Sequence, residues 1–388
     1  MKELSAIARE IPLSPIRQMF DMAQGMKDVV SFTLGEPDFQ TPPHIVEAAV
    51  ESLRSGAHHY TPNAGILPLR KAICETTQHT HGLNYDPETQ AIVTCGGTEA
   101  LVLSMMTLMD PGDECIISDP CWTNYATQLQ MCHQKAVCVP VTMDNRFQFT
   151  PEALESAITP RTKAFILNSP ANPTGGVAGV ETLRALAEVA VKHDLYVISD
   201  EVYSALLYDG EEAVSIATMP GMAERTLIVN SFSKSWAMTG WRVGYALGPA
   251  WIVKEMVKLQ ESLMACVNAS AQYAALAALT GPQEAFDEML AIYARRRAVV
   301  LEELATVPGI SCFAPQGAFY ALLDISQTGK CAKEFATDLL RKARVIIVPG
   351  EAFGETSSHY LRLSFATAEE NIREGIARIR EYMKTYYA

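Results

Sequence analysis

Lys234 follows an apolar, strand-like run and is surrounded by small or uncharged residues. Residues 230–234 come directly after the run at 226–229, and no carboxylate lies close to Lys234 in the sequence. In such a setting an amine loses its proton more easily, and a neutral lysine amine forms a Schiff base with an aldehyde. Taken alone, Lys234 would be one surface lysine among many, so polar residues elsewhere must support the prediction.

Asp200 ends a second apolar run, at residues 196–199. A carboxylate at the end of a buried strand is costly unless it is paired, and a protonated pyridine nitrogen is a suitable partner. The alternative is an aspartate that caps the next element. The sequence alone leaves both open.

A third group of residues suits a phosphate. Gly96 and Gly97, within 95–98, join a strand-like run to a helical stretch, where backbone N–H groups and the helix N-terminus favour an anion. Arg242, eight residues beyond Lys234, offers a charged partner for the same phosphate. An ordinary tight turn is the alternative here.

Trp122 is either a core residue or a flat surface on which a ring stacks. Together these residues fit an electron-withdrawing aldehyde cofactor that carries a phosphate.

Other chemistries are less well supported. The tetrad 231–234 matches S-x-x-K of serine enzymes that recognise penicillin, but K-T-G is missing and S-D-N is replaced by Ser199-Asp200-Glu201. No nucleotide-binding glycine fingerprint occurs. His79 and His81 have no carboxylate or cysteine beside them, so we expect a polar surface loop there and no metal site.

The elements that must position these residues alternate between strands and helices. We expect strands at residues 91–94, 115–117, 136–141, 164–167, 196–199, 226–229 and 243–247, with helices at 98–109, 151–158 and 181–193. Thr150 before Pro151 predicts the start of the second of these helices. Such alternation predicts an α/β fold with a mostly parallel sheet, whose ligand sites lie at the carboxyl ends of its strands.

The pattern changes near residue 285. A long charged helix is followed by strands at 319–323, 345–348 and 361–365 and by a terminal helix, which predicts a smaller α+β domain. Residues 295–297 are three arginines, which we interpret as a solvated helix face. We divide the chain into an N-terminal arm with part of the small domain (1–45), a large domain (46–284) and a small C-terminal domain (285–388).

Charge and composition bound the partners and the compartment. The 388 residues carry a formal charge of −13, which argues against nucleic acid and against anionic membrane surfaces. Nine cysteines with no C-x-x-C pair favour free thiols in a reducing compartment. No signal-like or membrane-spanning apolar stretch is found, so we expect a cytoplasmic protein.

Several longer sequence motifs resemble those of class I and II aminotransferases, pyridoxal-phosphate (PLP) enzymes of fold type I. The matches lie in the family's order and cover essentially the whole chain, at residues 35–39, 60–65, 168–175, 199–203, 231–244 and 360–364. The resemblance implies a large domain with a mostly parallel sheet flanked by helices and a smaller α+β domain. It implies PLP as the cofactor.

The resemblance also implies roles for individual residues. Lys234 matches the lysine that carries PLP as a Schiff base, and Asp200 matches the partner of the pyridine nitrogen. Tyr203 and Asn172 match the residues that bind the ring hydroxyl, and Trp122 matches the aromatic residue that stacks on the ring. Arg362, with the backbone of Gly35, matches the clamp for the substrate α-carboxylate. The phosphate is assigned to Gly97, Thr98, Ser231, Ser233 and Arg242. Tyr60 matches a tyrosine that reaches the phosphate of a neighbouring subunit, which implies a homodimer.

The implied activity is ping-pong transfer of an amino group between an L-amino acid and a 2-oxo acid. A carbon–sulfur β-lyase on the same fold shares every cofactor residue and is the alternative. A non-enzymatic PLP-binding protein is a further alternative, disfavoured by the complete catalytic set. Arg17, in a proline-stiffened arm, is our candidate for a cation that meets a distal carboxylate or amide of the substrate. The alternative is a surface arginine paired with an acidic neighbour.

Overall fold

A seven-stranded sheet forms the centre of the molecule. The computed structural model describes residues 2–13 and 15–387. Along the sheet the strands follow the order β2 (Ala91–Thr94), β8 (Gly244–Leu247), β7 (Thr226–Ser231), β6 (Tyr196–Asp200), β5 (Thr162–Asn168), β3 (Glu114–Asp119) and β4 (Lys135–Pro140). Every strand runs parallel to its neighbours except β8, which is antiparallel to both β2 and β7. The predicted α/β class and its mostly parallel sheet are confirmed.

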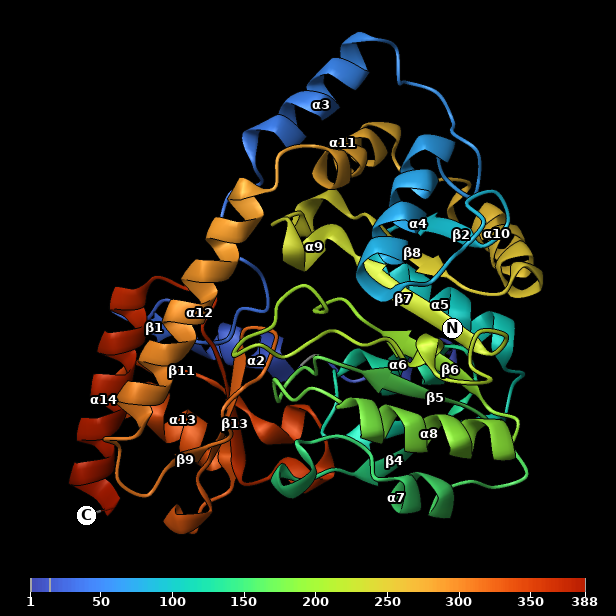
Figure 1. Ribbon diagram of the computed structural model, residues 1–388. Helices are drawn as coiled ribbons and strands as arrows, with labels where there is room; N and C mark the ends of the chain where they lie inside the picture. The colour runs from blue at the N-terminus through green and yellow to red at the C-terminus, as the bar shows by residue number, and fades with distance from the viewer. Residues whose placement is uncertain (1, 14, 388) are drawn as a thin grey trace.

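Helices cover both faces of this sheet because its strands are apolar on both sides. In β3, Cys115 and Ile117 pack into the core cluster that contains α5 (Gly96–Leu108) and α10 (Ala250–Met264). Ile116, between them, packs into the cluster that contains α7 (Pro151–Ser156) and α8 (Val180–Lys192). Alternate side chains of a strand point to opposite faces, which explains this division. Figure 1 shows α8 in front of β5 and β6.

A third core cluster lies at the β2 edge of the sheet. It joins β2 and β8 to α3 (Pro43–Arg54), α4 (Leu67–His81) and α11 (Ala269–Thr280). Short helices α6 (Asn124–Met131) and α9 (Phe232–Ser235) follow β3 and β7, where they carry residues of the site. The predicted helix start is confirmed at α7, where the Thr150 hydroxyl accepts a hydrogen bond from the Ala153 N–H, 3.2 Å away.

The C-terminal part builds a separate antiparallel sheet, in the order β12 (Val348–Pro349), β13 (Tyr360–Ser364), β10 (Tyr320–Asp324) and β9 (Ser311–Cys312). Helices α13 (Ala332–Ala343) and α14 (Glu369–Tyr387) pack with it, and α12 (Glu284–Leu304) runs to it from beside α11 (Figure 1). Near the N-terminus, β1 (Val30–Ser31) pairs in parallel with β11 (Val345–Ile346). The smaller α+β unit is therefore confirmed, whereas the boundaries at residues 45 and 284 stay predictions.

The structure corrects two expectations about the arm and the arginine run. The predicted arm contains two helices, α1 (Ala6–Glu10) and α2 (Pro15–Ala23). The arginine run is not a solvated face, because Arg296 and Arg297 are buried and pair with Asp38 and Asp209. A helix presents successive residues on different sides, so three adjacent arginines cannot share one face. Among the described residues no helix is both long enough and apolar enough to span a membrane.

Candidate active site

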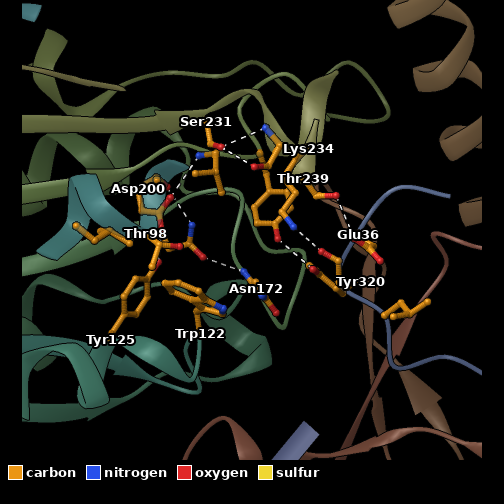
Figure 2. Close-up of a pocket in the computed structure, with 18 of the residues that line it drawn as sticks. Glu36, Thr98, Trp122, Tyr125, Asn172, Asp200, Ser231, Lys234, Thr239 and Tyr320 are labelled. Atoms are coloured by element: carbon orange, nitrogen blue, oxygen red, sulfur yellow. Dashed lines mark hydrogen bonds between the residues drawn. The ribbon is translucent and has the colours of Figure 1, made fainter. Parts of the chain in front are cut away.

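The carboxyl ends of several strands meet at one cavity of about 380 Å³. Figure 2 shows residues converging on it from the β2–α5 turn, from the ends of β3, β5, β6 and β7, and from the small domain. The segment 33–36 closes one side. Twelve residues predicted for the site line this cavity: Gly35, Gly97, Thr98, Trp122, Asn172, Asp200, Tyr203, Ser231, Ser233, Lys234, Arg242 and Arg362.

Lys234 lies in α9, directly after β7, and is partly buried. Its Nζ donates a hydrogen bond to the carbonyl oxygen of Gly35. The pKa of Lys234 is lowered to about 8, mainly by burial and also by the positive charges of Arg362 and Arg242, against the opposing effect of Glu36 and Asp200. An amine with this pKa is partly neutral near pH 7, which is the form that attacks an aldehyde or accepts a proton.

Asp200 ends β6 and is buried. Burial raises its pKa to about 6, although a hydroxyl and an N–H group partly stabilise the carboxylate. The hydroxyl belongs to Tyr125 and donates to Oδ2, while the N–H of Val202 donates to Oδ1 over 3.3 Å. Tyr125 was missed by the sequence analysis. Its position three residues after Trp122 was the available signal, because a turn between these residues brings their two rings together.

An anion cradle lies at the N-terminus of α5. A Cβ at Gly97 would lie 3.3 Å from Val202, and one at Gly96 (φ +74°) would lie 2.7 Å from the Arg242 guanidinium, so both glycines are needed for this close approach. The hydroxyl of Ser231 donates to that of Ser233 over 2.9 Å. Two hydroxyls, a guanidinium and a helix N-terminus together suit a phosphate.

Arg362, in β13, reaches the same cavity from the small domain and is fully buried. Its Nη1 donates to the Asn172 side chain over 3.1 Å and its Nη2 to the Thr33 carbonyl over 2.8 Å. Its Nε is buried and has no partner among the described residues. A guanidinium has five N–H donors, so several remain to bind a carboxylate.

Two tyrosines link the large domain to Arg362. The hydroxyls of Tyr203 and Tyr320 lie 3.0 Å apart, and the Tyr320 ring lies 4.5 Å from the Arg362 guanidinium carbon. Figure 2 shows Tyr320 on the far side of the cavity from Trp122, whose ring packs edge-to-face on Tyr125 with centroids 5.3 Å apart. Tyr320 was also missed, because its strand pattern shows burial but not which cavity it borders.

Two predicted residues lie away from this cavity in the single chain. Tyr60, in the loop between α3 and α4, is 88% exposed. Arg17, in α2, is also exposed, and its Nε lies 3.4 Å from Asp21 one helical turn later. That pair matches the alternative of a surface arginine with an acidic neighbour. Ser14 of the same arm lies outside the described residues.

The residues present fit a phosphorylated pyridine aldehyde. The glycine cradle suits the phosphate, because Gly96 lets the Arg242 guanidinium approach the N-terminus of α5 closely. Among the described residues, the buried Asp200 carboxylate has no cationic partner within salt-bridge distance, and a protonated ring nitrogen would supply one. The amine of Lys234 opens into the same cavity. PLP therefore satisfies the charges and donors that the described residues leave unpaired.

Comparison with known proteins gives the family. The family model for class I and II aminotransferases matches residues 27–379. The chain is 41% identical to an aromatic-amino-acid aminotransferase of Thermococcus litoralis and 42% identical to an aspartate aminotransferase of Pyrococcus abyssi, in each case over 96% of both chains.

Comparison with solved structures gives the same family. The chain is similar to an aromatic aminotransferase from Pyrococcus horikoshii, with a TM-score of 0.90 and 40% identity over 95% of this chain and 99% of that one. It is similar to an aspartate aminotransferase from Rhizobium meliloti, with a TM-score of 0.94 and 36% identity over 98% of each chain. These relatives do not favour the β-lyase alternative. The chain belongs to the class I and II aminotransferases, enzymes that depend on PLP.

Proposed function

We propose that this transaminase uses Lys234 as its catalytic lysine, Asp200 as the partner of the ring nitrogen and Arg362 as the clamp for the substrate α-carboxylate. The observation that supports this most is the enclosure of a lysine with a lowered pKa in the cavity that also contains a buried carboxylate and a buried arginine with free donors. Perturbed groups of opposite charge gathered in one cavity are typical of an active site.

When bound, PLP supplies an electron sink for the negative charge left on the α-carbon. Arg362 binds the α-carboxylate and so orients the α-hydrogen toward Lys234. In its neutral form Lys234 would take that proton and hold it at Nζ until it is returned. Asp200 keeps the proton on the ring nitrogen, and the Tyr125 hydroxyl keeps Asp200 in its anionic form.

The remaining predicted residues position the cofactor. Tyr203 and Asn172 are proposed to bind the ring hydroxyl, and Trp122 to stack on the ring. The phosphate is assigned to Gly97, Thr98, Ser231, Ser233 and Arg242, which line the same end of the cavity.

Lys234→Ala tests this assignment. The variant is expected to lose both half-reactions while it still binds PLP, because the phosphate and ring contacts remain. Added primary amines, which replace the missing base, should restore part of the activity. Lys258→Ala, an exposed lysine on α10, is the matched control. Turnover of Lys234→Ala close to that of the wild type would show that another group transfers the proton.

A homodimer with the site at its interface is part of this proposal. A second hollow of about 660 Å³ lies on the outer side of Arg242 and is lined by Cys95, Gly240, Trp241 and Asn268, among others. The partner subunit's copy of the exposed Tyr60 is proposed to enter here and reach the phosphate. Tyr60→Phe should then weaken PLP binding without changing the dimer, as measured by dialysis against phosphate and by sedimentation. Unchanged PLP retention would contradict this role.

Substrate choice depends on groups beyond the α-carboxylate clamp. The cations that line the cavity among the described residues are Lys234, Arg242 and Arg362, and the proposal gives each of them a role already. A dicarboxylic substrate therefore needs a cation from elsewhere, for which Arg17 remains our candidate if α2 moves over the cavity. A cytoplasmic location is also proposed, on the strength of the acidic charge and the unpaired cysteines.

A further inference from the structure

Two buried polar side chains, His81 and Glu201, lie outside the set of residues that line the cofactor cavity. His81 ends α4, and its side chain is only 9% exposed, contrary to the surface loop expected from the sequence. Its Nε2 lies 3.8 Å from Oε2 of Glu201, whose side chain is 6% exposed. The Nδ1 atom of His81 is buried without a partner among the described residues.

Glu201 is the residue after Asp200, and its carboxylate is held from three directions. Its Oε1 accepts hydrogen bonds from the hydroxyl of Ser199, at 2.8 Å, and from that of Ser215, at 2.6 Å. Its Oε2 faces His81. The backbone N–H of Glu201 donates to the Val229 carbonyl over 2.9 Å, which ties the end of β6 to β7.

A cavity of about 260 Å³ separates α4 from the segment that carries Lys234. His81, Glu201, Asn230 and Ser231 are among the residues that line it. Ser231 also lines the cofactor cavity, so this rear cavity and the cofactor cavity share that residue. Asp200 lines the cofactor cavity and Glu201, the next residue, lines the rear cavity. A shift of Glu201 would therefore move the backbone of Asp200 with it.

We propose that His81 and Glu201 are positioning residues, a buried pair that anchors the segment carrying Asp200 and Tyr203 in the orientation that PLP requires. This inference rests on the proposed roles of Asp200 and Tyr203. A buried carboxylate that loses its partner must take up a proton or move toward water, and either change releases the anchor. Among the described residues, Tyr85 and Tyr245 also lie near Glu201, and burial raises their pKa values. Both are therefore neutral phenols, and a phenol carries no positive charge in either protonation state, so neither can replace His81 as a partner of the carboxylate.

The test uses the holoenzyme with His81→Gln, Glu201→Gln and the double variant. His79→Gln is the matched control, because His79 is exposed in the same helix two residues earlier. Two properties are measured for each protein: the visible circular dichroism per bound PLP, which reports ring orientation, and the rate of PLP release to a carbonyl scavenger. Thermal unfolding of the cofactor-free proteins shows whether each variant folds.

Each single variant is expected to lose at least half of the visible dichroism and to release PLP about tenfold faster, equivalent to about 1.4 kcal/mol. The double variant should be no worse than the worse single variant, because the two residues act as a pair. His79→Gln should match the wild type. Wild-type dichroism in both single variants, or fully additive losses in the double variant, would overturn the proposal.

Ser215→Ala serves if Glu201→Gln does not fold. It removes one donor to Oε1 and keeps both His81 and Glu201, so a smaller loss of dichroism is expected, and an unchanged signal would overturn the anchor. The wild-type protein provides the separate check on function: if it shows no PLP signal at all, the proposed function fails, whichever way the variants behave.

Discussion

Replacing Asp200 with asparagine is expected to stabilise the cofactor-free protein while it removes most activity of the loaded enzyme. Within the part of the chain that the structure describes, the buried Asp200 carboxylate has no cationic partner within salt-bridge distance and accepts hydrogen bonds from the Tyr125 hydroxyl and the Val202 N–H. Its charge is therefore costly until PLP supplies a protonated ring nitrogen. The asparagine side chain has a similar shape but carries no charge.

The pKa of Asp200 gives the magnitude and the sign. Burial raises this pKa from 3.8 to about 6, so the native state binds the proton more tightly than the unfolded chain does. The stability from this group is present at low pH and is lost as the pH rises through about 6. The full difference corresponds to about 3 kcal/mol at neutral to alkaline pH. Roughly half of it develops between about pH 5 and about pH 8.

Urea unfolding of the cofactor-free proteins at these two pH values measures the effect. The free energy of unfolding of Asp200→Asn, relative to the wild type, should rise by about 1.5 kcal/mol from the lower to the higher pH. Asp287→Asn, an exposed aspartate in α12, is the matched control and should show no such change. A relative stability of Asp200→Asn that is the same at both pH values would refute the reasoning, because the buried charge would then carry no cost.

The other predictions concern the substrate and the support of Asp200. Arg362→Leu should lower kcat/KM for amino acids and oxo acids alike, by an amount equivalent to about 2–5 kcal/mol, since both share the α-carboxylate, whereas the exposed Arg341→Leu should not. Wild-type kinetics of Arg362→Leu in both half-reactions would count against the clamp. Tyr125→Phe should weaken PLP binding by about 1.5–3 kcal/mol through loss of the hydrogen bond to Asp200, and an unchanged dissociation constant would show that the hydroxyl is dispensable. Arg17→Ala should reduce activity with acidic donors or acceptors more than with neutral ones, whereas equal losses across a substrate panel would mean that Arg17 only holds the arm.

The sequence predicted the fold and most residues of the candidate site, because the reactive side chains follow apolar strands. Lys234, Asp200 and Gly97 are far apart in the chain, but the carboxyl ends of parallel strands meet at one edge. The motifs that resemble the family then added Arg362 and Asn172, which the position of strand ends alone would not have brought together.

What the sequence could not predict depends on side-chain direction and on long-range packing. Tyr125 and Tyr320 look like core aromatics until the structure shows which hydroxyl meets which partner. His81 ends a polar helix, yet it faces Glu201 more than a hundred residues later. Tyr60 is exposed in one chain, so the role proposed for it requires a second subunit.

The central claim is that Lys234 carries PLP. Borohydride reduction of the purified enzyme should abolish the visible absorption band and fix the cofactor onto one lysine. Peptide mapping then identifies that lysine by mass. The account predicts the label on Lys234, in the peptide that contains Ser231 and Ser233, and a label on any other lysine would contradict it.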